Sequence, residues 1–297
     1  MSTTETYGGQ AIIEGVMFKS KRALSFAVRK PDGKIHVEAK ADVFNPGYVL
    51  RLPFVRGFVS LIRMMIIGTK VLTRSSEIAM GDEQSSSAQK SSVWLWVFTG
   101  LVFILSFALA MGIFKGIPFF SSVFVGSFFG FSNSLVLLIE GVIKLTVLLL
   151  YVYLISFMPD IKRVFMYHGA EHKVIRAYEA GKSIIVENVR RASRFHPRCG
   201  TSFLVFVIAI SVVVYTVIPT DVPLWLRFVQ RLLLLPVVAG LSFEFLQFTA
   251  RVQEISWLSW LKLPGYGVQL LTTREPTDDQ IEVAIASFEA VRNYDAK

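Results

Sequence analysis

Four long apolar runs mark the chain, and each is close to the length that a helix needs to cross a bilayer. At about 1.5 Å per residue, runs of this length approach the roughly 30 Å of a hydrocarbon core. The pattern therefore predicts a mainly α-helical, polytopic membrane protein with about four transmembrane helices. The predicted spans are 93–114, 133–158, 201–218 and 232–248, and the apolar stretch 117–131, broken by Pro118, is expected to form an outer loop or re-entrant turn.

Charged residues are rare inside these runs. Glu140 and Lys144 lie four residues apart in the second run, a spacing that lets them pair on one helical face. Glu244 interrupts the fourth run. Because a carboxylate within a membrane span is costly unless it is paired or ligates a metal ion, Glu244 is a candidate functional residue. The alternative for Glu244 is an ion pair with Arg251 or Arg198.

Polar and amphipathic segments outside the runs predict a small α+β cytoplasmic portion. Residues 24–37 alternate apolar and polar positions around a Pro-Asp-Gly turn, a pattern typical of a β-hairpin. Residues 54–72 form an amphipathic pattern with Arg56, Arg63 and Lys70 on one stripe. Such a helix lies either on an anionic membrane surface or against the protein's own domain, and the pattern fits both.

Both ends of the chain carry local signals. Near the N-terminus, the pair Gly8-Gly9 before a short apolar stretch indicates a close approach of the backbone to another part of the molecule. After Pro276, Thr277 and Gln280 match a capping box, which predicts a terminal helix. The predicted segments are 1–53 (β-rich), 54–74 (amphipathic helix), 75–92 (Ser-rich linker), 93–158 (first transmembrane pair), 159–200 (loop), 201–248 (second transmembrane pair) and 249–297 (C-terminal segment).

Composition and charge add an orientation to this picture. Hydrophobic residues make up 53% of the chain, and the net charge is +9. Of the 31 Lys and Arg residues, 27 fall in 1–92, 158–200 and 249–297. The positive-inside rule then predicts a plasma-membrane protein with both termini and the central loop in the cytoplasm, next to anionic lipids. The same rule accounts for the basic excess without nucleic acid, and no aromatic-basic platform for nucleic acid stands out.

The chemically capable side chains gather in the central loop. His168 and His172 lie four residues apart, so a helix places both imidazoles on one face. His196 and Cys199 follow in the same loop, and Pro197 predicts that they sit on the opening turn of the third span. Zn²⁺ binds imidazole, thiolate and carboxylate ligands in tetrahedral sets. The predicted ligands of a divalent metal ion, expected to be Zn²⁺, are His168, His172, His196, Cys199 and Glu244.

The segment from His168 to His172 also matches H-x-x-E-H, a zinc-enzyme signature in which the histidines bind the metal and the glutamate activates water. Glu171 is therefore the candidate catalytic residue. Each assignment has a structural alternative, because short motifs arise by chance, His196 can cap a helix and Cys199 can fill a small buried space. The concentration of three of the four histidines and the single cysteine in one loop favours metal binding.

Seven short motifs spread along the chain carry a resemblance to a known family. They are Gly8–Met17, Asp160–Arg163, Tyr167–Lys173, Glu187–Arg191, His196–Phe203, Leu235–Gly240 and Thr272–Pro276. In these motifs, and over nearly its whole length, the chain resembles the YqhQ-like family of bacterial membrane proteins (domain of unknown function 1385). That family lacks an established function and is described as predicted metal-dependent enzymes. The resemblance therefore implies a metal-dependent enzyme without indicating a substrate.

These observations favour one function and leave two alternatives. The leading hypothesis is a metal-dependent hydrolase at the cytoplasmic face of the membrane, with Glu171 as the base for a metal-bound water and a lipid headgroup or membrane-proximal peptide as substrate. The second is a membrane scaffold or adaptor with a closed, structural metal site. The third is a transporter component, which the small number of charges in the spans and the lack of internal repeats disfavour.

Overall fold

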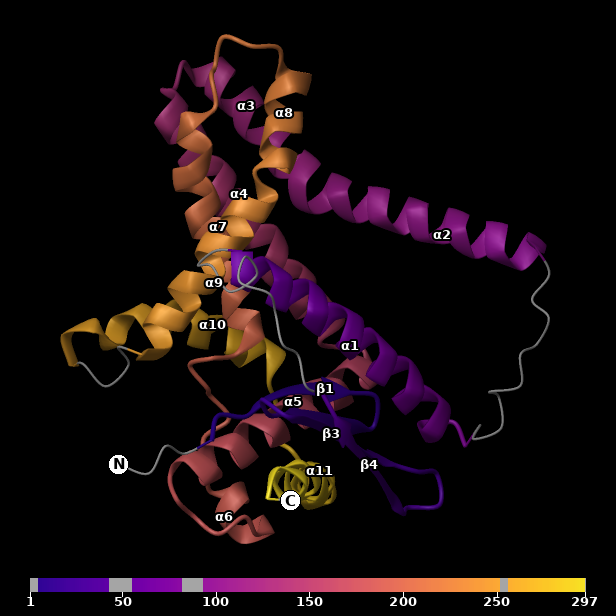
Figure 1. Cartoon of the computed structure of the whole chain (residues 1–297). Helices are drawn as coiled ribbons and strands as arrows, with labels where there is room; N and C mark the ends of the chain where they lie inside the picture. The colour runs from indigo at the N-terminus through magenta and orange to yellow at the C-terminus, as the bar shows by residue number, and fades with distance from the viewer. Residues whose placement is uncertain (1–4, 43–54, 82–92, 252–255, 297) are drawn as a thin grey trace.

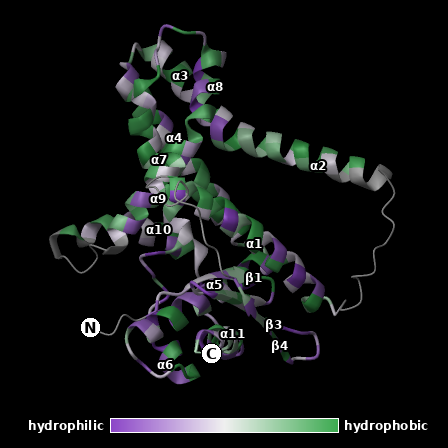
Figure 2. Ribbon diagram, viewed as in Figure 1, coloured by the Kyte–Doolittle hydropathy of each residue, from purple (hydrophilic) through white to green (hydrophobic). Residues whose placement is uncertain are grey.

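A computed structural model describes residues 5–42, 55–81, 93–251 and 256–296 of the chain. Within these residues, a bundle of apolar helices stands on a smaller domain built around a β-sheet (Figure 1). Hydrophobic residues concentrate in the bundle and hydrophilic residues in the sheet domain (Figure 2). The elements are β1 (Gly8–Ile12), β2 (Gly15–Lys19), β3 (Ala23–Arg29), β4 (Ile35–Ala41), α1 (Val55–Ala79), α2 (Val93–Met111), the π-helix η2 (Gly112–Gly116), α3 (Ile117–Phe129), α4 (Asn133–Ile155), α5 (Pro159–Glu179), α6 (Val186–Arg190), α7 (Gly200–Val214), the 3₁₀-helix η3 (Tyr215–Val217), α8 (Leu224–Leu233), α9 (Leu235–Arg251), the 3₁₀-helix η4 (Ser256–Lys262), α10 (Leu263–Thr272) and α11 (Asp278–Asp295).

The sheet is antiparallel, and its four strands follow chain order. Strands β3 and β4 confirm the predicted hairpin in residues 24–37. The hairpin of β1 and β2 has no signal in the pattern, because its two-residue turn is Ile13-Glu14 rather than the usual Asn-Gly or Asp-Gly. Glu14 adopts a positive φ of 52° there, and its carboxylate pairs with Arg163 on α5. A tertiary ion pair thus accompanies a turn conformation that the local sequence does not favour.

Helices cover both faces of the sheet. Val16 and Phe18 of β2 pack on one side with Phe288 of α11 and with α5. Met17, between them, points to the opposite face and packs with Val71 of α1. This alternation is the two-residue period of a strand, and it gives the domain two hydrophobic cores separated by the sheet.

Helix α1 packs on the protein's own domain, which is one of the two alternatives for the amphipathic segment. Val71 and Ile78 are buried against the sheet, whereas Met65 and Ile66 on another face of the helix are exposed. The helix continues past residue 74 and ends at Ala79. Residues 82–92 of the Ser-rich segment lie outside the part of the chain that the structure describes.

The terminal helix α11 confirms the capping-box prediction. The Thr277 side chain accepts a hydrogen bond from the backbone of Gln280, and the Gln280 side chain accepts one from the backbone N–H of Thr277. Ile281, Ala284 and Phe288 are fully buried in the core shared with β2, β3 and α5. The C-terminal segment is therefore an integral part of the sheet domain.

Among the described residues, three helices are long and apolar enough to cross a membrane, at Gly100–Phe129, Asn133–Ile155 and Gly200–Val217. The α2 part of the first one extends away from the bundle (Figure 1). A fourth candidate is the pair α8 and α9, which is bent by 44°. The bend follows from Pro236, because proline has no N–H for the preceding turn and its ring displaces the carbonyl there. The apolar stretch expected to be a loop or re-entrant turn is instead helix α3, which continues from α2 through η2. Its Pro118 occupies one of the first two helical positions, where proline is tolerated.

Charged residues meet inside the bundle between α4 and α8. Glu140 and Lys144 form the predicted pair, with 2.6 Å between Lys144 Nζ and Glu140 Oε1. Arg231 of α8 binds the other carboxylate oxygen of Glu140. All three side chains are at most 6% exposed, and Lys115 lines the same small cavity. We refer to Glu140, Lys144 and Arg231 as the bundle ion cluster.

Candidate metal centre

Helix α5 presents two imidazoles toward the start of α7. His168 and His172 lie one turn apart, with ring centroids 4.4 Å from each other. Cys199 is the N-cap residue of α7, and its Sγ lies 3.3 Å from His168 Nε2. One donor atom from each of the three residues lies within 4.8 Å of the other two. The structure therefore brings together three of the five predicted ligands, and we call them the donor triad.

Backbone carbonyls determine which nitrogen of each imidazole faces the triad. His168 Nδ1 donates to the carbonyl of Thr272 at 2.8 Å, and His172 Nδ1 donates to the carbonyl of Arg194 at 2.5 Å. A carbonyl oxygen can only accept, so Nδ1 carries the proton and Nε2 keeps its lone pair in a neutral ring. This arrangement is typical of metal-binding histidines, whose second nitrogen bonds to a carbonyl or carboxylate.

The donor set fits a zinc-type ion in chemistry and spacing. Ligand bonds of about 2.0 Å to nitrogen and 2.3 Å to sulfur in a tetrahedron imply donor atoms roughly 3.5 Å apart. The observed 3.3 Å between His168 Nε2 and Cys199 Sγ is near that value, and the limit of 4.8 Å for the full triad requires only a small contraction. Three protein donors leave one tetrahedral position for water or substrate, as in catalytic zinc sites.

Glu171 lies beside the triad in a cavity of about 280 Å³. Its side chain is only 5% exposed, and burial raises the pKa of the carboxyl to about 7, although the neighbouring His168 opposes this shift. A Cβ at Gly9 of β1 would come within 2.6 to 2.7 Å of the Glu171 side chain. The glycine pair of the N-terminus therefore does mark a close approach, and the partner of Gly9 is the candidate catalytic carboxylate.

His196 lies in the same cavity but bonds elsewhere. Its Nε2 is 3.3 Å from both carboxylate oxygens of Glu179, and its backbone exchanges two 2.9 Å hydrogen bonds with the Gln269 side chain. Burial lowers the pKa of His196, and the effect of burial outweighs the opposing effect of Glu179. The expected position on the first turn of α7 is wrong, since that helix begins at Gly200 and His196 and Pro197 precede it in a turn.

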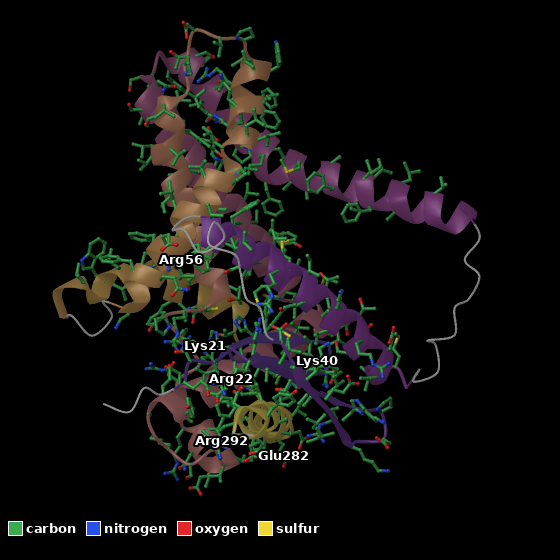
Figure 3. All side chains as sticks on the ribbon, viewed as in Figure 1. Lys21, Arg22, Lys40, Arg56, Glu282 and Arg292 are labelled. Atoms are coloured by element: carbon green, nitrogen blue, oxygen red, sulfur yellow. The ribbon has the colours of Figure 1, made fainter. Side chains whose placement is uncertain are left out.

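Glu244 is not among the residues that meet at the triad. Both of its carboxylate oxygens accept hydrogen bonds from Arg56 of α1, at 2.8 and 2.6 Å. Helix α1 approaches α9 closely because Gly57 leaves room for Phe243, and Arg56 lies where α1 meets the bundle (Figure 3). The carboxylate is paired, as the alternative expects, and the partner that the structure shows is Arg56, a residue that the alternative did not name. Gln247, one turn further along α9, lines the metal-centre cavity instead.

Several site residues escape the sequence reasoning. The carbonyls of Thr272 and Arg194 belong to segments remote from α5 in sequence, and a backbone acceptor leaves no mark in a residue pattern. Gln269 positions the His196 turn from α10. For Gly9 the glycine pair was a usable signal, although it did not identify the partner.

Comparison with known proteins gives two matches in sequence. Residues 52–294 match a family described as protein of unknown function (DUF1385). The chain is also 44% identical over 298 residues to the uncharacterized protein YqhQ of Bacillus subtilis (strain 168), an alignment that covers 98% of this chain and 93% of that protein. No solved structure matches.

Proposed function

The chain belongs to the DUF1385 family, and because that family has no assigned activity, we propose from the geometry of the site that it is a metal-dependent hydrolase. The observation that carries the proposal is the convergence of two imidazole lone pairs and one thiol beside a buried, cavity-lining carboxylate. Separately, each of these features has a structural explanation. Their combination in one cavity is the arrangement that metal-assisted hydrolysis requires.

In the proposed mechanism, His168, His172 and Cys199 hold the ion. When bound, a divalent cation such as Zn²⁺ would supply Lewis acidity at this site. Glu171 accepts the proton of the attacking water, and a carboxyl pKa near 7 suits a base that later returns the proton to the leaving group. The backbone at Gly9 limits the positions open to the Glu171 side chain, and the carbonyls of Thr272 and Arg194 keep both imidazoles in the ligating tautomer.

We further propose that the apolar helices span the plasma membrane with the sheet domain in the cytoplasm. Of the 31 basic residues, 27 lie outside the predicted spans and the short segments between them at the far end of the bundle. The positive-inside rule assigns that basic side to the cytoplasm. Cys199 precedes the first residue of a candidate span, so the proposed reaction takes place at the membrane surface.

Metal content is the first test. Detergent-purified protein should contain nearly one zinc-type ion per chain by mass spectrometry, and a His168→Ala/His172→Ala variant should lose it. His36→Ala is a matched control, because His36 lies in β4 and pairs with Glu38 away from the cavity. Absence of metal from the wild type after zinc reconstitution, with the protein folded, would eliminate the metalloenzyme.

A second measurement separates the hydrolase from a scaffold with a structural metal. X-ray absorption should report two nitrogen donors, one sulfur and one light atom that exchanges with solvent. A shell of four protein ligands, completed by movement of His196, would favour the scaffold. In a hydrolase screen, Glu171→Gln should keep the metal and lose activity, and full activity in that variant would refute the assigned base.

A further inference from the structure

A second cavity adjoins the candidate metal centre. Its volume is about 510 Å³, and it lies around the C-terminal end of α5 and the segment that follows α6. Thr6 and Arg198 line both this cavity and the metal-centre cavity. The two cavities are therefore immediate neighbours.

Cations outnumber anions in the lining. The positively charged residues of the lining are Arg176, Lys182, Arg191 and Arg198, and the negatively charged ones are Glu5 and Glu179. Glu179 is already engaged by Arg198 and His196. Within the part of the chain that the structure describes, Arg176 and Lys182 form no salt bridge. Arg191 pairs with Glu187, so Arg176 and Lys182 carry the excess positive charge of the cavity. We call it the basic cavity.

The cations extend the two elements that carry the metal donors. His168, His172 and Arg176 repeat every four residues along α5, so Arg176 lies about 6 Å beyond His172 along the helix axis. Arg198 directly precedes Cys199. A group bound between Arg176 and Arg198 would thus lie roughly one helical turn from the donor triad.

We propose that the basic cavity binds a phosphate or phosphoester group of the molecule that is hydrolysed at the donor triad. The role in catalysis rests on the proposed hydrolase function, whereas the anion site follows from the cavity alone. Three of the four cations are arginines, whose planar guanidinium groups bind two phosphate oxygens in parallel. A phospholipid headgroup and a soluble phosphoester share this chemistry.

Two of the arginines also have a structural role, which the test must separate from anion binding. Arg176 is the basic residue in the last turn of α5, where a cation offsets the partial negative charge of the helix end. Arg198 bonds to Glu179. Neither role predicts that phosphate binds, so direct binding is the decisive readout.

The experiment titrates inorganic phosphate into the full-length, detergent-purified protein after chelation of metals, with isothermal calorimetry as the readout. Arg176→Ala/Lys182→Ala should weaken binding at least about tenfold, since one charge-assisted hydrogen bond is enough for that change. Lys40→Ala/Arg292→Ala removes the same charge from β4 and α11, outside the cavity lining (Figure 3), and should bind as the wild type does. No saturable binding in the wild type, or equal binding in the cavity variant, would overturn the proposal.

Two further arms identify the source of the group and separate this inference from the hydrolase. Competition against phosphate by glycerol phosphate or by short-chain phosphatidic acid in mixed micelles distinguishes soluble from lipid phosphoesters, and displacement by either supports the site. The His168→Ala/His172→Ala variant should still bind phosphate. If the wild type binds phosphate but no metal, only the hydrolase fails; if it binds metal but no phosphate, only this inference fails.

Discussion

The helical bundle carries two buried polar clusters of different chemistry, the bundle ion cluster within it and the donor triad at its junction with the sheet domain. In the first, one carboxylate satisfies Lys144 and Arg231, and the charges stabilise each other directly. In the second, one nitrogen of each histidine and the Cys199 thiol lie within 4.8 Å of one another, with no salt bridge to any of the three among the described residues. The carbonyls of Thr272 and Arg194 accept hydrogen bonds from the Nδ1 atoms of the two rings, which point away from the triad.

The difference shows how a buried polar cluster can be classified from its pairing. Opposite charges that meet inside a bundle offset part of each other's cost of burial. The triad differs, because the Cys199 thiol can donate to His168 Nε2 without any ion, and a metal ion would in addition engage the His172 imidazole. Ion pairing therefore accounts for the bundle ion cluster, whereas the triad is the cluster for which we propose a metal ion.

The largest expected effect comes from breaking the bundle ion cluster. Glu140→Gln leaves the buried Lys144 and Arg231 without a counter-charge, which should cost about 3 to 5 kcal/mol of unfolding free energy. Denaturant unfolding in detergent, followed by tryptophan fluorescence, measures it. A loss below about 1 kcal/mol, typical of an exposed pair, would mean that water reaches the cluster.

Metal removal should cause the next largest loss of unfolding free energy. The loss should depend on the residues of the donor triad and not on the bundle ion cluster. At a free metal concentration about a hundredfold above the dissociation constant, bound metal stabilises the fold by roughly 2.7 kcal/mol, and a chelator abolishes this. Thermal unfolding with and without chelator measures the shift. The Glu140→Gln variant should respond as the wild type does, whereas Cys199→Ala should respond much less; an identical response in Cys199→Ala would remove the thiol from the ligand set.

A smaller effect should follow from crowding the carboxylate of Glu171, the proposed base. Gly9→Ala places a methyl group against Glu171, which should cost about 1 to 3 kcal/mol and displace the carboxylate. Gly8→Ala is a matched control, because a Cβ at Gly8 meets nothing within 4 Å. Unfolding free energy and hydrolase activity should both separate the two variants, and equal behaviour would show that Gly9 does not position Glu171.

The smallest expected effect comes from breaking an exposed ion pair, and its cost in unfolding free energy serves as the reference for the buried cluster. Glu187 and Arg191 pair within the α6 region at 2.6 Å, with both side chains more than half exposed. Glu187→Gln should cost only about 0.3 to 0.5 kcal/mol in the same unfolding assay, because solvent screens the pair and its geometry is costly in entropy. A cost comparable to that of Glu140→Gln would invalidate burial as the distinguishing factor.

Local pattern accounts for much of the fold. Hydrophobic runs located the apolar helices, alternation located β3 and β4, and Thr277 with Gln280 located the start of α11. These signals are readable because each depends on residues within a few positions of one another. The continuation of α2 into α3 was not predicted, because Gly, Ser and Pro residues usually indicate the end of a helix. Proline is nevertheless tolerated in the first turn of a helix, which is where Pro118 lies.

The site was predictable only where its geometry is local. The spacing of His168 and His172 fixed their common face on α5, and Cys199 joined them as expected. The partner of Glu244 was not predictable, because Arg56 is 188 residues away and meets it only through packing of α1 on α9. The position of His196 before α7 was not predictable for the same reason, since the Gln269 side chain that bonds to its backbone belongs to α10.

The hydrogen bond from His168 to Thr272 has a consequence for the order in which the protein matures. Both histidines and the cysteine are synthesised well before Thr272 and the α11 helix that completes the sheet domain. A nascent chain therefore carries all three donors without the carbonyl that orients the His168 ring. In the proposed site, the acceptor that orients the His168 ring is thus added only after α10 has been synthesised and has docked.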